Sequence, residues 1–381
     1  MKVIILIPGM PLKIGDIKGG VFSALSNLLK GLSEKNISVR VISFNREVTQ
    51  PHIVEYSPNI EIHYTPESKL PHVVNFLFAG SAVLKKHIKE FEPSLVHFSM
   101  SGYILLTKVF GLLGKKQLVT IHGIVFPEAR LKKKLKDKLV WYSNGIVEIM
   151  LCPKNLIHLS KYSLALQGGK KEQTYTIIPN AVDPTFFDIP VKSNSANKLI
   201  YVGSIEYNKN LLLLLKALQL LIAKERFFFL DVVGGFMDEE YRNEVTRFIK
   251  ENQLENYVKL YGWASQQQVQ EVMIQSDILV VCSMQESLPM AIAEAMSAGK
   301  LVIASDVGGI PEMITHGEDG FIFNVAKPEN LVSILDELYG DTVRIEQMQK
   351  AAKEKATYTY HSSIVATKTI AFYEQIIANE K

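Results

Sequence analysis

A chain of 381 residues exceeds the length of one typical hydrophobic core, so two domains are expected. With 47% hydrophobic and 21% charged residues, the composition is that of an ordinary globular protein. The net charge of +3 is too small to indicate a nucleic-acid partner.

The N-terminal and cysteine patterns favour a reduced, cytoplasmic setting. Cys152 and Cys282 lie far apart in apolar surroundings, which is not the pattern of a disulfide framework. No apolar run reaches the roughly 18 residues of a membrane span. The apolar run at 3–7 is shorter than a signal-peptide core and leads into a glycine loop, so we interpret it as a first strand.

Strand-like apolar runs alternate with helical patterns along the whole chain. Such alternation is typical of parallel sheets built from βαβ units, and it predicts an α/β protein with two doubly wound, Rossmann-like domains. Expected helices include 21–33 and 75–91. The expected strands are 3–7, 38–44, 60–64, 95–98, 117–121, 147–151, 175–178, 198–202, 227–233, 258–261, 278–282, 301–304 and 320–323.

The polar, proline-bearing segment 188–197 has no periodicity and is interpreted as the interdomain linker. It separates an N-terminal domain, 1–187, from a C-terminal domain, 198–356. We expect ligands to bind in the cleft between two such domains.

A pair of glutamates follows the predicted strand 278–282. Glu286 lies in the loop, and Glu294 lies within a helix that starts near Pro289 and is capped by Gly299. Free amides at a helix start suit a phosphate, and carboxylates accept hydrogen bonds from sugar hydroxyls. The segment therefore predicts a site for a sugar phosphate at the carboxyl ends of the strands.

Glu286 and Glu294 resemble the Glu-x7-Glu motif of family 4 retaining glycosyltransferases, whose fold is GT-B. Further segments occur in the order that this family shows: Gly19-Gly20, Ile121-His122-Gly123, Ile178-Pro179-Asn180-Ala181-Val182-Asp183, Gly203 with Lys209, and Gly308-Gly309-Ile310-Pro311-Glu312. The ordered set spans nearly the whole chain. It implies a retaining transfer from a nucleoside-diphosphate sugar (UDP or GDP) to a glycan or lipid-linked acceptor, in cell-surface polysaccharide biosynthesis. The crossing C-terminal helix of the family is expected at 357–381.

The resemblance also implies roles for individual residues. Glu294 should accept from the ribose hydroxyls, and Glu286 from the transferred sugar. Pro289 has no N–H and cannot be one of the amide donors. Residues expected to bind the donor are Gly19, Gly20, Gly203, Ser204, Lys209, Trp263, Glu286, Ser287, Leu288, Met290, Ala291 and Glu294. His122, Lys209 and Glu286 are expected to take part in catalysis, His122 by contacting the sugar near its anomeric carbon.

The chain departs from the family at Ser204, where an arginine usually follows the glycine. A serine donates one hydrogen bond but brings no charge, so Lys209 is expected to offset the charge of the leaving diphosphate. Trp263 is placed where the family often holds the base.

Two further predictions concern metals and membranes. The sequence contains no Asp-x-Asp pair, and we expect activity without a divalent metal and without a cofactor. A basic run with leucines at 131, 135 and 139 is amphipathic and predicts contact with an anionic membrane from the cytoplasmic side. Its cations are Arg130, Lys132, Lys133, Lys134, Lys136 and Lys138.

Three alternatives remain open at this point. The chain could be another GT-B enzyme, either an inverting transferase or a phosphorylase. It could be a nicotinamide-dependent oxidoreductase, although the Gly-x-Gly-x-x-Gly fingerprint is missing. A catalytically inactive nucleotide-binding protein is the third, because of Ser204.

Overall fold

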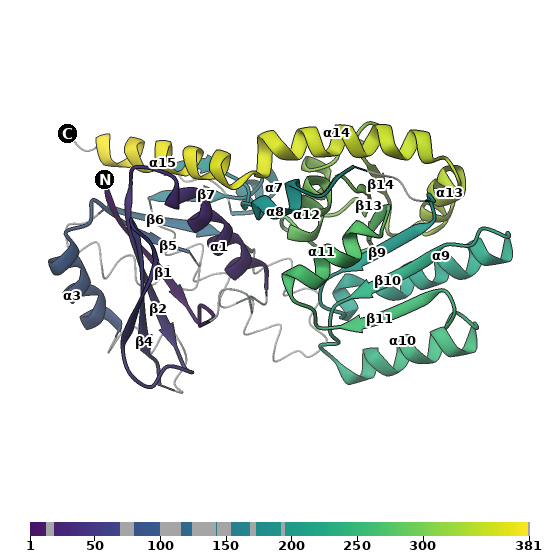
Figure 1. Ribbon diagram of the computed structural model, residues 1–381, viewed down its shortest axis with the longest axis horizontal. Helices are drawn as coiled ribbons and strands as arrows, with labels where there is room; N and C mark the ends of the chain where they lie inside the picture. Colours follow the sequence, from purple (N-terminus) through teal and green to yellow (C-terminus); the bar gives the residue numbers. More distant parts are fainter. Residues whose placement is uncertain are drawn as a thin grey trace. The chain divides into compact units, whose positions relative to one another are not determined.

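The computed structural model describes residues 1–12, 19–68, 80–99, 116–123, 142, 154–167, 173–191 and 195–379 (Figure 1). The chain divides into two compact units. The first comprises the described residues up to Ala181 together with those from Ser362 onward, and the second comprises the described residues of Val182–His361. Each unit is built around its own sheet, as the length of the chain requires.

The first unit contains an eight-stranded sheet in the order β3-β4-β2-β1-β5-β6-β7-β8. Every neighbouring pair is parallel except β3 with β4, which is antiparallel at one edge. The strands are β1 (Lys2–Pro8), β2 (Ser38–Asn45), β3 (His52–Ser57), β4 (Ile60–Pro66), β5 (Leu95–Phe98), β6 (Lys116–Ile121), β7 (Asn155–His158) and β8 (Thr174–Ile177).

Four described helices of this unit are α1 (Gly20–Ser33), α3 (Ser81–Phe91), α7 (Lys161–Gln167) and α15 (Ser362–Ala378). Helices α1 and α15 lie side by side (Figure 1). They approach closely at Gly31, where an added Cβ would lie 2.2 Å from the carbonyl oxygen of Ser362. The end of the chain is thereby part of the core of the first unit.

The second unit contains a six-stranded, fully parallel sheet in the order β11-β10-β9-β12-β13-β14. Its strands are β9 (Lys198–Val202), β10 (Phe229–Val233), β11 (Val258–Gly262), β12 (Ile278–Val281), β13 (Leu301–Ser305) and β14 (Phe321–Phe323). Its helices are α8 (Pro184–Phe187), η4 (Tyr207–Lys209), α9 (Leu211–Ala223), α10 (Glu239–Glu251), α11 (Gln266–Ile274), α12 (Met290–Ser297), η5 (Ile310–Glu312), α13 (Glu329–Leu338) and α14 (Thr342–Tyr360).

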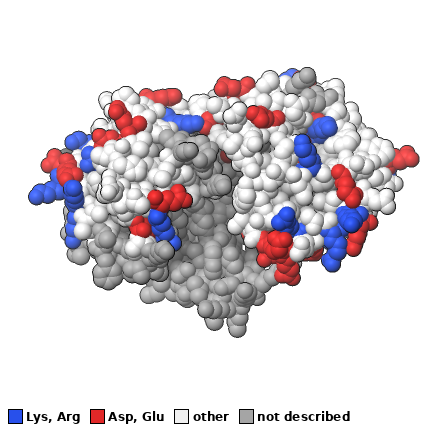
Figure 2. Space-filling model, turned by 60° about the horizontal axis from the view of Figure 1, so that its bottom comes forward, with Lys and Arg blue, Asp and Glu red and all other residues white. Residues whose placement is uncertain are grey.

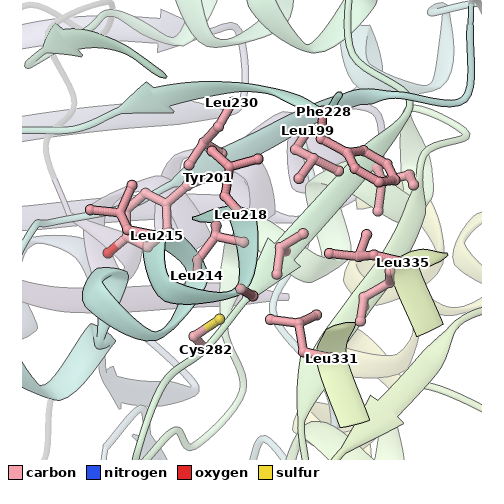
Figure 3. Packing of buried hydrophobic residues seen from close by; sticks show 14 of the residues in the cluster. Leu199, Tyr201, Leu214, Leu215, Leu218, Phe228, Leu230, Cys282, Leu331 and Leu335 are labelled. Atoms are coloured by element: carbon pink, nitrogen blue, oxygen red, sulfur yellow. The ribbon is translucent and has the colours of Figure 1, made fainter. Parts of the chain in front are cut away.

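One core of the second unit lies between its sheet and α9 (Figure 3). Leu214, Leu215 and Leu218 of α9 pack with side chains of β9 and β10 such as Leu199 and Leu230. The helix begins with five consecutive leucines, all of them buried, because α10 and α13 also contact it. Cys282 belongs to the same core, and burial raises the pKa of its thiol.

The structure corrects several boundaries. Residues 182–191 and 195–197 cluster with the second unit, so the structure changes unit at Val182, before the predicted limit at 187 and the predicted linker 188–197. The chain rejoins the first unit at Ser362, later than the predicted helix start at 357, because α14 ends at Tyr360 and His361 adopts an extended conformation. Strands β3 and β7 were not expected, and the predicted strand 147–151 lies outside the described residues.

On the face shown in Figure 2, acidic and basic side chains of the described residues lie interspersed. Within the described part of the chain, none of the helices is long and apolar enough to cross a membrane. The basic run at 130–138 lies outside the described residues, so the structure does not test the predicted membrane contact.

Candidate active site

In the second unit, four turns follow the carboxyl ends of neighbouring strands. They lie after β9 (Gly203), β10 (Gly234), β11 (Trp263) and β12 (Glu286). Because β11, β10, β9 and β12 are adjacent and parallel, these turns share one edge of the sheet. The sequence-predicted donor residues of this unit are therefore brought together.

The turns after β9 and β10 interlock through glycines. Gly203 and Gly234 adopt positive φ angles of +146° and +154°, which favour glycine. A Cβ on Gly234 would lie 1.8 Å from the carbonyl oxygen of Gly203. Ile205 N also donates to the carbonyl oxygen of Gly235 at 2.8 Å. This close packing fixes the backbone that begins at Gly203.

Trp263 lies against the next turn. A Cβ on Gly235 would be 2.1 Å from the indole Nε1, so the missing side chain makes room for the ring. The tryptophan is 55% exposed, an unusual state for so large an apolar side chain. An exposed aromatic ring held beside a glycine turn offers a surface on which a planar base can stack.

Lys209 and Glu286 form an ion pair. Lys209 Nζ lies 2.6 Å from Glu286 Oε1, which also accepts a hydrogen bond from Ser283 Oγ at 2.7 Å. The two side chains are 25% and 11% exposed, so the pair is only partly accessible to water. Ser204, at the position where the family usually has arginine, donates through Oγ to Glu206 Oε1 at 3.0 Å.

The start of α12 presents amide groups. Pro289 occupies the N-cap position, one residue before the first turn in which it was expected. Among the described residues no side chain caps this end of the helix, and its first amides have no partner within the helix. The preceding loop is held by the turn after β13, since Gly309 N donates to the carbonyl oxygen of Glu286 at 3.3 Å. Ser287, Leu288, Met290 and Ala291 therefore lie in and just after the loop that carries Glu286.

Glu294 lies within α12, as predicted, and its environment opposes ionisation. Burial is the larger cause and the carboxylate of Asp183 the smaller one, and together they raise the pKa of Glu294 to about 7. Glu294 as a whole is half-buried, but its carboxyl group is enclosed by the protein. Asp183 is buried, caps α8 and accepts from Thr185 N at 3.1 Å. A carboxyl held in this way is a frequent feature of ligand sites.

The first unit carries the remaining predicted residues. Gly19 is the N-cap of α1 with φ +101°, and Gly20 is the first residue of that helix. His122 follows β6 and lines a cavity of about 30 Å³, as do Ser99, Thr120 and Asn180. Burial lowers the pKa of His122 to about 4, while the nearby Asn180 side chain opposes this. The ring is therefore neutral at physiological pH.

Two protein-family models match the chain. Glycosyltransferase Family 4 matches residues 18–186, and Glycosyl transferases group 1 matches residues 182–355, which begins where the second structural unit begins. The chain belongs to these family 4, group 1 glycosyltransferases. The resemblance drawn from the ordered motifs is thereby confirmed.

Individual relatives are distant. A phosphatidylinositol N-acetylglucosaminyltransferase component of Homo sapiens is 29% identical over 328 residues, covering 84% of this chain but only 63% of that protein. An uncharacterised 41.2 kDa protein in the cps region of Klebsiella pneumoniae is 22% identical, covering 94% of this chain and 97% of the relative.

Solved structures agree on the fold. Sucrose-phosphate synthase from Thermosynechococcus elongatus superposes with a TM-score of 0.80 at 18% identity, over the whole of both chains. HepE of Anabaena in complex with UDP-glucose gives 0.75 at 17% identity, covering 98% of this chain and 100% of that one. The glycosyltransferase therefore has the GT-B fold.

Some residues around the site had not been singled out from the sequence. Ser283 donates to Glu286, and Glu206 accepts from Ser204. Each pair lies within one turn and is only two or three residues apart, so the sequence could have indicated it. The approach of Asp183 to Glu294 joins positions more than a hundred residues apart, which no local pattern reveals.

Proposed function

We propose that this glycosyltransferase moves a sugar from a nucleoside-diphosphate sugar to a hydroxyl of a glycan or lipid-linked acceptor, with retention at the anomeric carbon. The single observation that carries the proposal is the arrangement of Lys209, Glu286 and the free amides at the start of α12 on one sheet edge. A cation and helix amides suit a diphosphate, while the carboxylate suits sugar hydroxyls.

Donor binding requires an exchange of partners at Lys209. It is the single lysine or arginine in segments 203–210, 283–291 and 308–312, and in the free chain it pairs with Glu286. A diphosphate that takes Lys209 releases Glu286 to accept from the sugar. The same binding event thus prepares the groups for both parts of the donor.

The chemistry follows from these contacts. The bond from the anomeric carbon to the β-phosphate oxygen breaks, and a bond from that carbon to the acceptor oxygen forms on the same face. The proton of the acceptor hydroxyl leaves with the departing phosphate. Lys209 and the amides of α12 offset the negative charge that grows on that phosphate, which is the main catalytic contribution.

Several observations support the choice of substrates. The similar HepE structure was solved with UDP-glucose, and a relative is named for transfer of N-acetylglucosamine to phosphatidylinositol. Another relative is encoded in a cps region. We propose UDP or GDP as the nucleotide of the donor, a glycan or lipid-linked acceptor bound by the first unit, and a role in cell-surface polysaccharide or glycolipid synthesis at the cytoplasmic face of a membrane.

Thermal-shift binding tests the donor site. UDP, GDP, ADP and NAD are compared on the wild type, on Lys209→Met and on a matched surface control, Lys216→Met, which lies on the exposed side of α9. A ligand that binds only the folded state raises the melting temperature. Stabilisation by one nucleoside diphosphate, reduced in Lys209→Met alone, supports the proposal, whereas stabilisation by NAD alone contradicts it.

Retention, metal independence and membrane contact have separate tests. The anomeric configuration of the product is read by NMR, and inversion would refute the proposed stereochemistry. Activity should persist in excess chelator, and its full loss would show that a metal is needed. Vesicle flotation with and without anionic lipid tests the basic run that includes Lys132, Lys133 and Lys134.

A second function is favoured by Ser204. Without the usual arginine, the chain could bind nucleotide without catalysing transfer. Nucleotide binding with no transfer to any acceptor, restored by Ser204→Arg, would identify that case.

A further inference from the structure

The first unit contains a buried hydrogen-bonded chain that ends at a small cavity. His97 of β5 is 2% exposed, and both of its ring nitrogens are engaged. Nδ1 lies 2.7 Å from the hydroxyl of Tyr373 on α15, and Nε2 lies 2.7 Å from Thr120 Oγ1 on β6. Burial lowers the pKa of His97 to about 3, so its ring is neutral and carries one N–H.

The direction of this chain follows from what surrounds its two ends. Tyr373 is fully buried, and within the described residues its hydroxyl contacts His97 alone. If Nδ1–H donated to the tyrosine oxygen, the buried O–H would lack an acceptor, which is unfavourable. The satisfied arrangement has Tyr373 O–H donating to Nδ1 and Nε2–H donating to Thr120 Oγ1.

Thr120 Oγ1 then accepts from His97, so its own hydroxyl proton is free to be donated to another group. Thr120 is 6% exposed, and the only described hydrogen bond of its side chain is with His97. Thr120 lies in β6, and His122 follows Ile121, the last residue of that strand. Both line the cavity of about 30 Å³.

His122 is the unsatisfied group on the other side of the cavity. Neither ring nitrogen has a partner at good hydrogen-bonding geometry among the described residues, although both are screened from solvent and the Asn180 side chain lies near the ring. A cavity of this size exceeds the roughly 10–15 Å³ needed for one water, and a buried water needs two or more polar partners. Thr120 and His122 supply a donor and an acceptor.

We propose that Tyr373, His97 and Thr120 are positioning residues for His122, acting through one water molecule bound in this cavity. The water accepts from Thr120 Oγ1–H and donates to one nitrogen of His122, which leaves the proton of the neutral ring on the other nitrogen. His122 is thereby held in a single tautomer. This inference rests on the proposed function only in placing His122 at the transferred sugar.

Histidine-selective ¹⁵N labelling tests the chain without any substrate. Long-range ¹H–¹⁵N spectra of the full-length protein should show His97 with its proton on Nε2 from pH 5 to pH 8. His122 should be one neutral tautomer in the wild type and a mixture in Thr120→Val, which keeps the β-branched shape but removes the hydroxyl. Thr120→Ser is the matched control and should retain the wild-type spectrum.

Kinetics give the second readout. In Thr120→Val, kcat should fall by about tenfold, as for the loss of one hydrogen bond at a substrate-facing group, with little change in KM for the donor. Thr120→Ser should restore kcat. A wild-type His97 with its proton on Nδ1, or Thr120→Val with unchanged His122 signals, overturns the proposal.

The outcomes separate this inference from the proposed function. If no transfer is detected, the tautomers still decide whether the positioning chain exists. If Thr120→Val fails to fold, Thr120→Ala replaces it: removing the hydroxyl should again give a mixture of His122 tautomers, and unchanged His122 signals would contradict the proposal.

Discussion

Glu294→Gln tests whether the ionised carboxyl of Glu294 lowers the free energy of unfolding of the chain. The pKa of Glu294 is raised to about 7 by burial and by the carboxylate of Asp183, whereas a glutamate in the unfolded chain titrates near 4.5. The folded state therefore holds this proton more tightly than the unfolded state. The resulting stability is fully present below pH 4.5 and is lost as the pH rises through 7.

The size of the effect follows from the two pKa values. They differ by about 2.5 pH units, and one pH unit corresponds to about 1.4 kcal/mol, which gives at most about 3 kcal/mol for ionising Glu294 in the folded chain. Residual exposure of the side chain reduces this, so we expect about 2 kcal/mol. Glutamine keeps the shape without the charge, and Glu294→Gln should raise the melting temperature at pH 8 by roughly 4–8 °C.

The assay is thermal unfolding of the ligand-free chain at pH 8 and pH 5. The gain from Glu294→Gln should be clear at pH 8 and much smaller at pH 5, where wild-type Glu294 is mostly protonated. Glu244→Gln, on the exposed face of α10, is the control and should change little at either pH. A Glu294→Gln variant that melts no higher than wild type at pH 8 would refute the reasoning, because some unrecognised donor must then stabilise the carboxylate.

Two glycines give further predictions. Gly31→Ala should destabilise the first unit by about 2 kcal/mol or more, because the new Cβ would lie 2.2 Å from the backbone oxygen of Ser362; urea unfolding checks this, and unchanged stability would contradict the packing of α1 on α15. Gly235→Ala should displace the indole of Trp263, whose Nε1 would lie 2.1 Å from the added Cβ. Its nucleotide affinity should fall by about tenfold with little loss of stability, as measured by calorimetry, and an unchanged affinity would remove Trp263 from the base site.

Much of the fold could be predicted because parallel strands leave a strong signal. Buried strands such as β9 and β12 are continuous apolar runs, and their predicted bounds agree with the structure to within one residue. Edge strand β3 was missed since half its residues face solvent and it lacks such a run. The structure changes unit earlier than the predicted linker, because 182–191 packs through Val182, Phe186 and Ile189 into the second unit, a tertiary contact that no local pattern reveals.

Neighbouring residues of one turn could be grouped from the sequence, whereas contacts between distant residues could not. The residues of one turn, such as Ser204 and Lys209, follow directly from the sequence. The contact of His97 with Tyr373 joins positions 276 residues apart and places a histidine inside a strand that otherwise reads as apolar. Only the tertiary structure shows that its ring is hydrogen-bonded on both sides.

Several carboxyl groups lie around the proposed donor site of the second unit. Glu206, Glu286, Glu294 and Asp183 bring carboxyl groups to its turns and helices, against Lys209. In the free chain Ser204 engages Glu206, Lys209 pairs with Glu286, and the raised pKa of Glu294 lets that group take up a proton. A diphosphate adds further negative charge, so its binding must draw on Lys209 and on the amides of α12. For the proposed donor, the departure at Ser204 should therefore make Lys209 the side chain on which affinity depends most.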